Sequence, residues 1–217
     1  QGLYTQKNGT TEVNKDSTFF AGESTIENGI LNWNTENDYD GTLKVVGGLV
    51  NIGNKNDASL TLGDGSYIAK DAYVNLVENS DITLDGGSLT LDGNDAWKGD
   101  IFIGEEDNVG SGTLIIDGLT SNGGIAANGG TIDIVSGRLT ASTNDIIKEA
   151  TTVKIADNTL LYVNGGDVTL GTNTDWKSKG GVLLDNGKLT VKDFTSDNGI
   201  LQANNGTLDI NNSTPNS

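Results

Sequence analysis

The feature that most constrains the fold of this chain is that one long segment of it occurs twice. Trp97-Lys98 returns as Trp176-Lys177 at a constant offset of 79 residues, together with the surrounding aliphatic, Asn and Gly-Gly positions. After a short deletion the match continues, so that residues 72–134 correspond to residues 151–210. Self-similarity over so many positions is typical of a solenoid, in which each repeat packs on its neighbours. We therefore expect residues 1–217 to form a single elongated domain.

Short alternating segments fill the repeat. An aliphatic residue occupies every second position in units such as Leu43-Lys44-Val45 and Ile82-Thr83-Leu84, and Gly-Gly, Asn-Gly or Asp-Gly pairs separate the units. Alternation predicts short strands with one buried and one solvated face, and the glycine pairs predict turns. One helical turn is expected over residues 143–150, at the junction between the two copies.

The repeat favours a parallel β-helix over an antiparallel sandwich, which also turns often. In a β-helix each coil of about three strands stacks its inward aliphatic residues on those of the coil below, so equivalent positions carry like residues. We predict an all-β, right-handed parallel β-helix (solenoid) of roughly eight coils, three per repeat unit, about 40 Å long by strand spacing.

The two ends of such a rod carry unpaired backbone groups, which predicts end-to-end self-association unless something covers them. The candidates for covering them are the Phe19-Phe20 segment, the polar tail 211–217 and neighbouring coils of a longer parent protein. We favour the parent protein, because solenoids need atypical terminal repeats.

Charge and composition exclude several function classes. With 13 Lys and Arg against 30 Asp and Glu, the net charge is −17. Nucleic-acid binding needs a basic surface, and an anionic membrane surface attracts cations, so neither partner is expected. An apolar run of 18 or more residues is also missing, so we expect no membrane insertion of this fragment. Cys and His are absent, which removes disulfides, thiolate zinc sites and the commonest general base.

Four short units carry a resemblance to a known family. They have the forms G-T-L-x-I and G-G-x-L-T-L and begin at Gly41, Gly86, Gly112 and Gly206. These units resemble the passenger domains of bacterial autotransporter adhesins, although filamentous-haemagglutinin-type repeats and phage fibres share them. Those passengers are acidic, cysteine-poor, right-handed β-helices exported through an outer-membrane barrel. The resemblance implies an extracellular or bacterial cell-surface location, attached to the outer membrane through a translocator outside this sequence.

Two equivalent loops supply the candidate ligand site. Trp97 and Lys98 lie in one loop and Trp176 and Lys177 in the other, and Trp33 is an earlier equivalent. If the copies are three coils apart, the rings of Trp97 and Trp176 lie on one side of the rod, about 14 Å apart. A flat ring beside carboxylates and amides suits a sugar, so a host or surface glycan is expected ahead of a protein receptor. The alternative is that each ring folds back over the base of its loop.

No metal, cofactor or catalytic site is expected. The sequence Glu36-x-Asp38-x-Asp40-Gly41 begins like a calcium loop, but its twelfth position is Gly47 instead of Glu. An ordinary acidic turn is therefore favoured over calcium binding. The run Glu105-Glu106-Asp107 is interpreted as a charged loop that discourages sideways association.

Many β-helices are polysaccharide-cleaving enzymes, which makes such an enzyme a further possible function. Asn173-Thr174-Asp175 resembles one element of the polygalacturonase site, but the adjacent Asp pair and the Gly-His-Gly are missing. Arg138 is the sole candidate for the base of a site resembling that of pectate lyases. Because no set of nucleophile, base and orienting group can be named, no enzyme is expected. The preferred function is a bacterial adhesin; the alternatives are a structural spacer or a surface-layer or fibre building block, and then a polysaccharide-cleaving enzyme.

Overall fold

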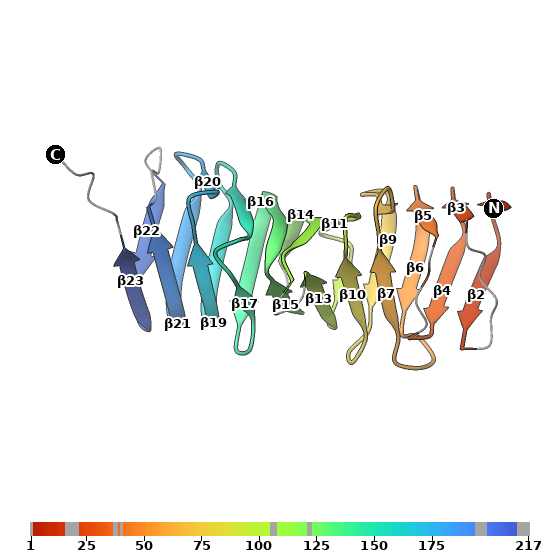
Figure 1. Cartoon of the computed structure of the whole chain (residues 1–217), viewed down its shortest axis with the longest axis horizontal. Helices are drawn as coiled ribbons and strands as arrows, with labels where there is room; N and C mark the ends of the chain where they lie inside the picture. The colour runs from red at the N-terminus through yellow and green to blue at the C-terminus, as the bar shows by residue number, and fades with distance from the viewer. Residues whose placement is uncertain are drawn as a thin grey trace.

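The computed structural model describes residues 2–15, 22–36, 39, 41–104, 108–120, 123–193 and 199–211. These residues form a rod of short strands, β1 to β23, that follow one another along its length, with the two termini at opposite ends (Figure 1). The described residues contain no helix. The rod is a right-handed parallel β-helix of about 9 turns, which confirms the predicted fold class and slightly exceeds the predicted number of coils.

The strands make three sides of a prism, and on each side they pair in parallel with the strands of the turns before and after. The first side consists of β1 (Gly2–Gln6), β3 (Gly22–Ile26), β5 (Thr42–Val45), β8 (Tyr67–Ile68), β11 (Ser88–Asp92), the first parts of β14 (Gly110–Thr120) and β16 (Gly129–Ser142), β18 (Thr152–Ile155) and β20 (Asp175–Trp176). The second side begins with β2 (Thr10–Asn14), β4 (Ile30–Asn34), β6 (Gly48–Ile52), β9 (Ala72–Leu76) and β12 (Ala96–Trp97).

Four later strands, β14, β16, β19 and β21, turn a corner and serve two sides. The second side continues through the later parts of β14 and β16, the first parts of β19 (Leu160–Leu170) and β21 (Gly181–Lys192), and β22 (Ile200–Ala203). The third side consists of β7 (Ser59–Leu62), β10 (Asp81–Leu84), β13 (Asp100–Ile103), β15 (Gly124–Ala127), β17 (Ile146–Ile147), the later parts of β19 and β21, and β23 (Thr207–Asn211).

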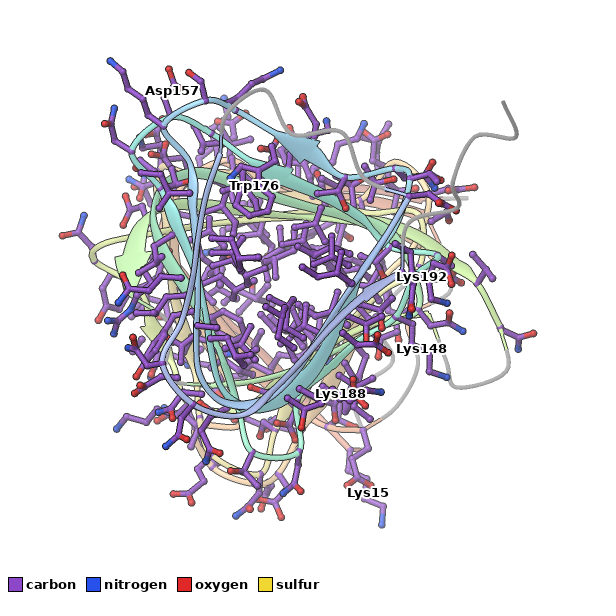
Figure 2. All side chains as sticks on the ribbon, turned by 90° about the vertical axis from the view of Figure 1, so that its left-hand side faces the viewer. Lys15, Lys148, Asp157, Trp176, Lys188 and Lys192 are labelled. Carbon is purple, nitrogen blue, oxygen red and sulfur yellow. The ribbon has the colours of Figure 1, made fainter. Side chains whose placement is uncertain are left out.

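The core is a set of aliphatic columns that run along the rod. On the third side, Ile82 pairs in register with Ile101, and Ile101 with Ile125, and all three side chains are buried. Burial of such stacked side chains drives folding, and truncating one to Ala costs about 2–5 kcal/mol. Looking along the rod, Figure 2 shows the side chains that fill the interior of the coils.

Many corners of the prism share one turn. The turn ends in Ser, Thr or Asp, whose backbone N–H donates to the carbonyl three residues earlier and whose side-chain oxygen accepts a backbone N–H from the preceding coil. This occurs at Ser66, Ser80, Asp95, Asp145 and Thr151, which bind the N–H groups of Leu43, Ala58, Val74, Ile125 and Gly129 respectively. Each of these side chains therefore ties two successive coils together.

The predicted helical turn over residues 143–150 is wrong. This segment holds one of the corner turns, in which Asn144 has a φ of 76°, and then the strand β17. A left-handed φ is incompatible with a continuing right-handed helix. Ile147 is buried and pairs with Ala127 and Val168 of the neighbouring coils, so stacking decides the conformation.

The sequence repeat does not correspond to a whole number of turns. Strand β9 lies on the second side of the prism, whereas its sequence equivalent β18 lies on the first. The same change of side separates β12 from β20. The second copy is therefore rotated by one side relative to the first, and the prediction of three coils per unit is wrong.

The two ends of the rod differ in chemistry. In the first coil the Tyr4 hydroxyl bonds the Thr11 hydroxyl at 2.7 Å, and the buried Gln6 amide donates to the Gly9 carbonyl at 3.0 Å. Leu3 is the one large apolar side chain exposed among the described residues of this coil. The last coil instead exposes apolar side chains, at Ile200, Leu201, Leu208 and Ile210. The Phe19-Phe20 segment and residues 212–217, expected as end covers, lie outside the described residues.

Candidate functional site

The three tryptophans are buried inside the rod. Trp33, Trp97 and Trp176 are 1%, 3% and 4% exposed, and Figure 2 shows Trp176 within the outline of the coils. Each indole N–H donates to a backbone carbonyl, at Ser59, Gly99 and Gly180 respectively. The prediction of exposed rings that stack on a sugar is therefore wrong. For Trp97 and Trp176 the alternative, in which the ring folds back over its loop, is correct, whereas Trp33 bonds the following coil.

A glycine in the following coil makes room for two of these rings. A Cβ atom added at Gly123 would overlap the indole of Trp97, and one added at Gly199 would overlap that of Trp176. Burying an indole removes a large apolar area from water, which outweighs leaving it exposed in a loop. The signal in the sequence is the glycine that precedes Gly124-Ile125 in one copy and Ile200 in the other.

The structure does not bring the five predicted residues together. Trp33 and Trp97 belong to one ladder on the second side, with Ile52 and Leu76 between them, whereas Trp176 lies on the first side above Ile155. Their lysine neighbours are exposed. Lys177 follows β20 on the first side and forms an ion pair with Asp175 at 2.8 Å. Lys98 follows β12 on the second side.

The structure gives no support, among the residues that it describes, to the candidate metal site, and the residues considered for catalysis take up other roles. Asp38 and Asp40 of the candidate calcium loop lie outside the described residues, and among the described residues no group of three or more Asp, Glu, His or Cys could hold a metal ion. The Arg138 guanidinium packs over the ring of Tyr162, 5.3 Å from its centre. Thr174 ends a corner turn, and its hydroxyl is buried.

A hollow on the surface lies over β15, on the third side. The outward positions of β15 are Gly124 and Ala126, whereas the preceding coil presents Asp100 and Phe102. The following coil presents Ile146 opposite Ala126. One coil with small side chains is thus recessed between two coils with larger ones.

Two adjoining cavities fill this recess, which we call the β15 trough. The first, of about 390 Å³, is lined by Asp100, Phe102, Gly123, Gly124, Ile125, Ala126, Ser142, Thr143, Asn144 and Asp145. The second, of about 460 Å³, is lined by Thr83, Phe102, Gly104, Ala126, Ala127, Asn128, Ile146 and Lys148. Both cavities include Phe102 and Ala126 in their lining, so they adjoin each other along the strand.

The two ends of the trough differ in charge. At the first end the buried Asp145 carboxylate accepts N–H groups from Ser142 at 2.6 Å and Ile125 at 3.0 Å. Burial raises the pKa of Asp145, these two hydrogen bonds oppose the shift, and the nearby Asp100 carboxylate adds to it. Lys148 lies at the other end. The trough therefore runs from an acidic end to a basic end across a half-buried phenyl ring.

Sequence reasoning did not identify this trough, because its residues belong to ordinary alternating strands. Phe102 stands between the core residues Ile101 and Ile103, and its importance depends on small outward side chains in the next coil. That relation appears only once the register between β13 and β15 is known. The one local signal is an aromatic residue at an outward position where most strands carry Thr, Asp or Lys.

No family model, curated protein or solved structure matches this chain. The resemblance to autotransporter passenger domains therefore stays a prediction. Among the described residues, no helix is long and apolar enough to cross a membrane.

Proposed function

We propose that this chain is a stiff structural rod of a bacterial cell-surface or secreted protein, and that its role is to hold attached segments at a fixed distance. The observation that carries this proposal is the unbroken sequence of parallel pairings from β1 to β23, through all the described coils. Each coil is held by backbone hydrogen bonds to its neighbours, so bending the rod would break bonds on one side. At about 4.8 Å per turn, 9 turns give a rod about 43 Å long.

Side chains add longer connections along the rod. Lys55 pairs with Glu12 at 2.8 Å and Lys192 with Glu149 at 2.5 Å, in each case across 43 residues of sequence. Such exposed ion pairs contribute little individually. They join coils that are not direct neighbours, and so support the stiffness that a spacer needs.

The acidic surface supports a role outside the cytoplasm or at a cell surface. A net charge of −17 discourages sideways sheet association, which is the main hazard of a protein made of exposed strands. The absence of Cys means that folding does not depend on the redox state of the compartment. Both properties suit a rod that folds after export.

The role as a spacer can be tested by placing the chain between a membrane anchor and a fluorescent domain on a cell surface. The control replaces the rod with a Gly/Ser linker of 217 residues, whose end-to-end distance varies widely. Energy transfer to a membrane dye reports the height of the fluorescent domain. We expect one narrow range of heights with the rod and a broad range with the linker; equal distributions would overturn the proposal.

A second candidate function is attachment, as in the adhesin that the sequence predicts. The observation that favours it is the β15 trough, which combines an aromatic ring with polar groups on a rigid surface. The buried tryptophans do not contribute to it. An adhesin would use the same rod to present this trough to its receptor.

A further inference from the structure

We infer that the β15 trough binds an uncharged oligosaccharide chain, lying along the strand with one sugar ring against Phe102. This site differs from the tryptophan loops and does not depend on the spacer role. The inference depends on the shape of the trough, its aromatic wall and its polar groups.

The shape suits a single linear chain. The walls are the coils of β13 and β17, which lie two strand spacings apart, or about 9.5 Å between backbones. Between them the floor is made of Gly124 and Ala126. The Asp100 carboxylate leans over Gly124, where an added Cβ would lie 2.0 Å from its oxygen, and Ala126 leaves the middle of the trough open. Along the strand the lining extends over residues 123–128, which is about 17 Å at 3.3 Å per residue.

Phe102 provides the apolar surface that a sugar ring needs. Its side chain is half-buried and lines both cavities, so its ring stands at the middle of the trough. An aromatic ring offers a flat apolar face with no hydrogen-bonding groups of its own, against which the C–H face of a sugar can pack. The neighbouring Ala126 keeps that position open.

Polar groups surround the ring on both sides. The Asp100 carboxylate is exposed and accepts no hydrogen bond from the residues that the structure describes. It is therefore available to accept hydroxyl groups, and Asn144 and Thr83 add further donors and acceptors. The corner turn that carries Asn144 is fixed by the hydrogen bonds of Asp145, so these groups are positioned before a ligand arrives.

The charges favour neutral sugars over acidic ones. Asp81 and Asp100 lie in register on the third side, and Asp145 is close to Asp100. Uronic or sialic acids would meet like charge at this end of the trough and a net charge of −17 over the whole chain.

The backbone geometry disfavours an extended peptide in the trough. Strand β15 is already paired with β13 on one side and β17 on the other, so its backbone has no free edge along the trough. A peptide that adds to a sheet needs such an edge for its main-chain hydrogen bonds. Sugar hydroxyls need only side-chain partners.

The test is retention of the purified chain on immobilised neutral oligosaccharides of several linkages, beside sulfated and uronic acid polymers, followed by titration calorimetry with the retained sugar.

Two variants change the trough itself. Phe102→Ala removes the ring and Ala126→Met fills the trough. Both positions face outward, so the fold should persist, and circular dichroism checks this. We expect at least tenfold weaker binding for each variant. Phe102→Tyr keeps the ring and should bind within about threefold of the original chain. Tyr73→Ala, which removes an exposed aromatic ring elsewhere, is the matched control and should not change affinity.

Three results would overturn the inference. The first is that no neutral oligosaccharide binds at millimolar concentration, and the second is that acidic polymers bind instead. The third is binding that neither Phe102→Ala nor Ala126→Met weakens. Because none of these variants alters the core, loss of sugar binding with an unchanged rod would leave the spacer proposal standing.

Discussion

At the scale of single residues, the corner carboxylate of Asp95 shows how much one side chain can connect. It accepts the Val74 N–H of the preceding coil at 2.6 Å and the Asp92 N–H of its own turn at 2.7 Å. Burial nevertheless raises the pKa of Asp95 to about 6, because the carboxylate loses water, and these hydrogen bonds offset only part of that effect. The charged form of Asp95 is thus less favourable in the folded chain than in the unfolded one.

The raised pKa of Asp95 predicts how the stability of the folded chain changes with pH. Since the folded value is above the unfolded value of 3.8, the folded state binds more protons, and its stability falls as the pH rises from about 4 to about 6. In Asp95→Asn this part of the pH dependence should disappear. Urea unfolding at pH 4, 5, 6 and 7 measures it, with the exposed Asp64→Asn as control. The same pH dependence in Asp95→Asn and the original chain would contradict the prediction.

A second residue-scale prediction concerns the glycine that accommodates Trp97. Gly123→Ala would place a methyl group against the indole and within 2.6 Å of the Gly99 carbonyl oxygen, so the ring or the strand must shift. We expect a loss of about 1–3 kcal/mol in the free energy of unfolding. Gly63→Ala is the control, because its Cβ would lie 3.8 Å from the nearest atom. Equal denaturation midpoints for the two variants would show that the packing around Trp97 is loose.

At the scale of elements, side-chain ladders supplement the backbone pairing. On the second side an amide ladder runs from Glu12 through Asn32 and Asn51 to Asn75, with hydrogen bonds of 2.6, 2.8 and 3.0 Å. The bonds to Lys55 and Asn32 hold the pKa of Glu12 below its usual value. Four successive strands are linked in this way, which fixes their register in addition to the aliphatic core.

The middle of this amide ladder is its most sensitive point. Asn51→Ala would leave the Asn32 oxygen and the Asn75 amide without their partners in a largely buried position. We expect it to cost about 1–3 kcal/mol in the free energy of unfolding. The exposed Asn94→Ala, whose side chain bonds only the local Asp92, should change stability little. Chemical denaturation of both variants measures the difference, and equal stability would mean that the ladder is dispensable.

Some of the strands could be predicted from the sequence and others could not. Strands such as β10 and β13 were predictable because alternating aliphatic residues depend only on which face is buried. β17 was not, since residues 143–150 have no strand alternation, and only the coils on either side make them extended. The predicted grouping of the tryptophans on one side of the rod was wrong for a similar reason. The sequence repeat and the turns of the rod have different periods, so equivalent residues occupy different sides.

At the scale of the whole molecule, the chemistry of the ends predicts how copies associate. The first coil exposes one large apolar side chain, Leu3, beside hydrogen-bonded polar groups, whereas the last coil exposes four, among them Leu208 and Ile210 at 37% and 55%. Apolar surface is best covered by apolar surface, so in solutions of this 217-residue chain alone we expect two copies to meet through their last coils and form a closed dimer. Head-to-tail stacking would instead give open polymers.

Sedimentation velocity over a range of concentrations tests this prediction. Ile210→Lys should abolish the dimer, because it places a charge in the contact, whereas Leu3→Lys at the opposite end should leave it intact. A chain that stays monomeric at high concentration, or that forms polymers sensitive to Leu3→Lys, would contradict it.

The most direct test of the central claim, that the chain is a stiff rod, is a distance distribution between its two ends. Because the chain has no Cys, spin labels attach only to cysteines that are introduced. We place two, Lys7→Cys and Asn204→Cys, in exposed turns of the first and last coils. Pulsed electron resonance then measures the separation of the two labels. We predict a single narrow peak near the length of the rod, about 40 Å by strand spacing. A broad distribution, or a main peak at a much shorter distance, would contradict the stacked β-helix and the spacer role that depends on it.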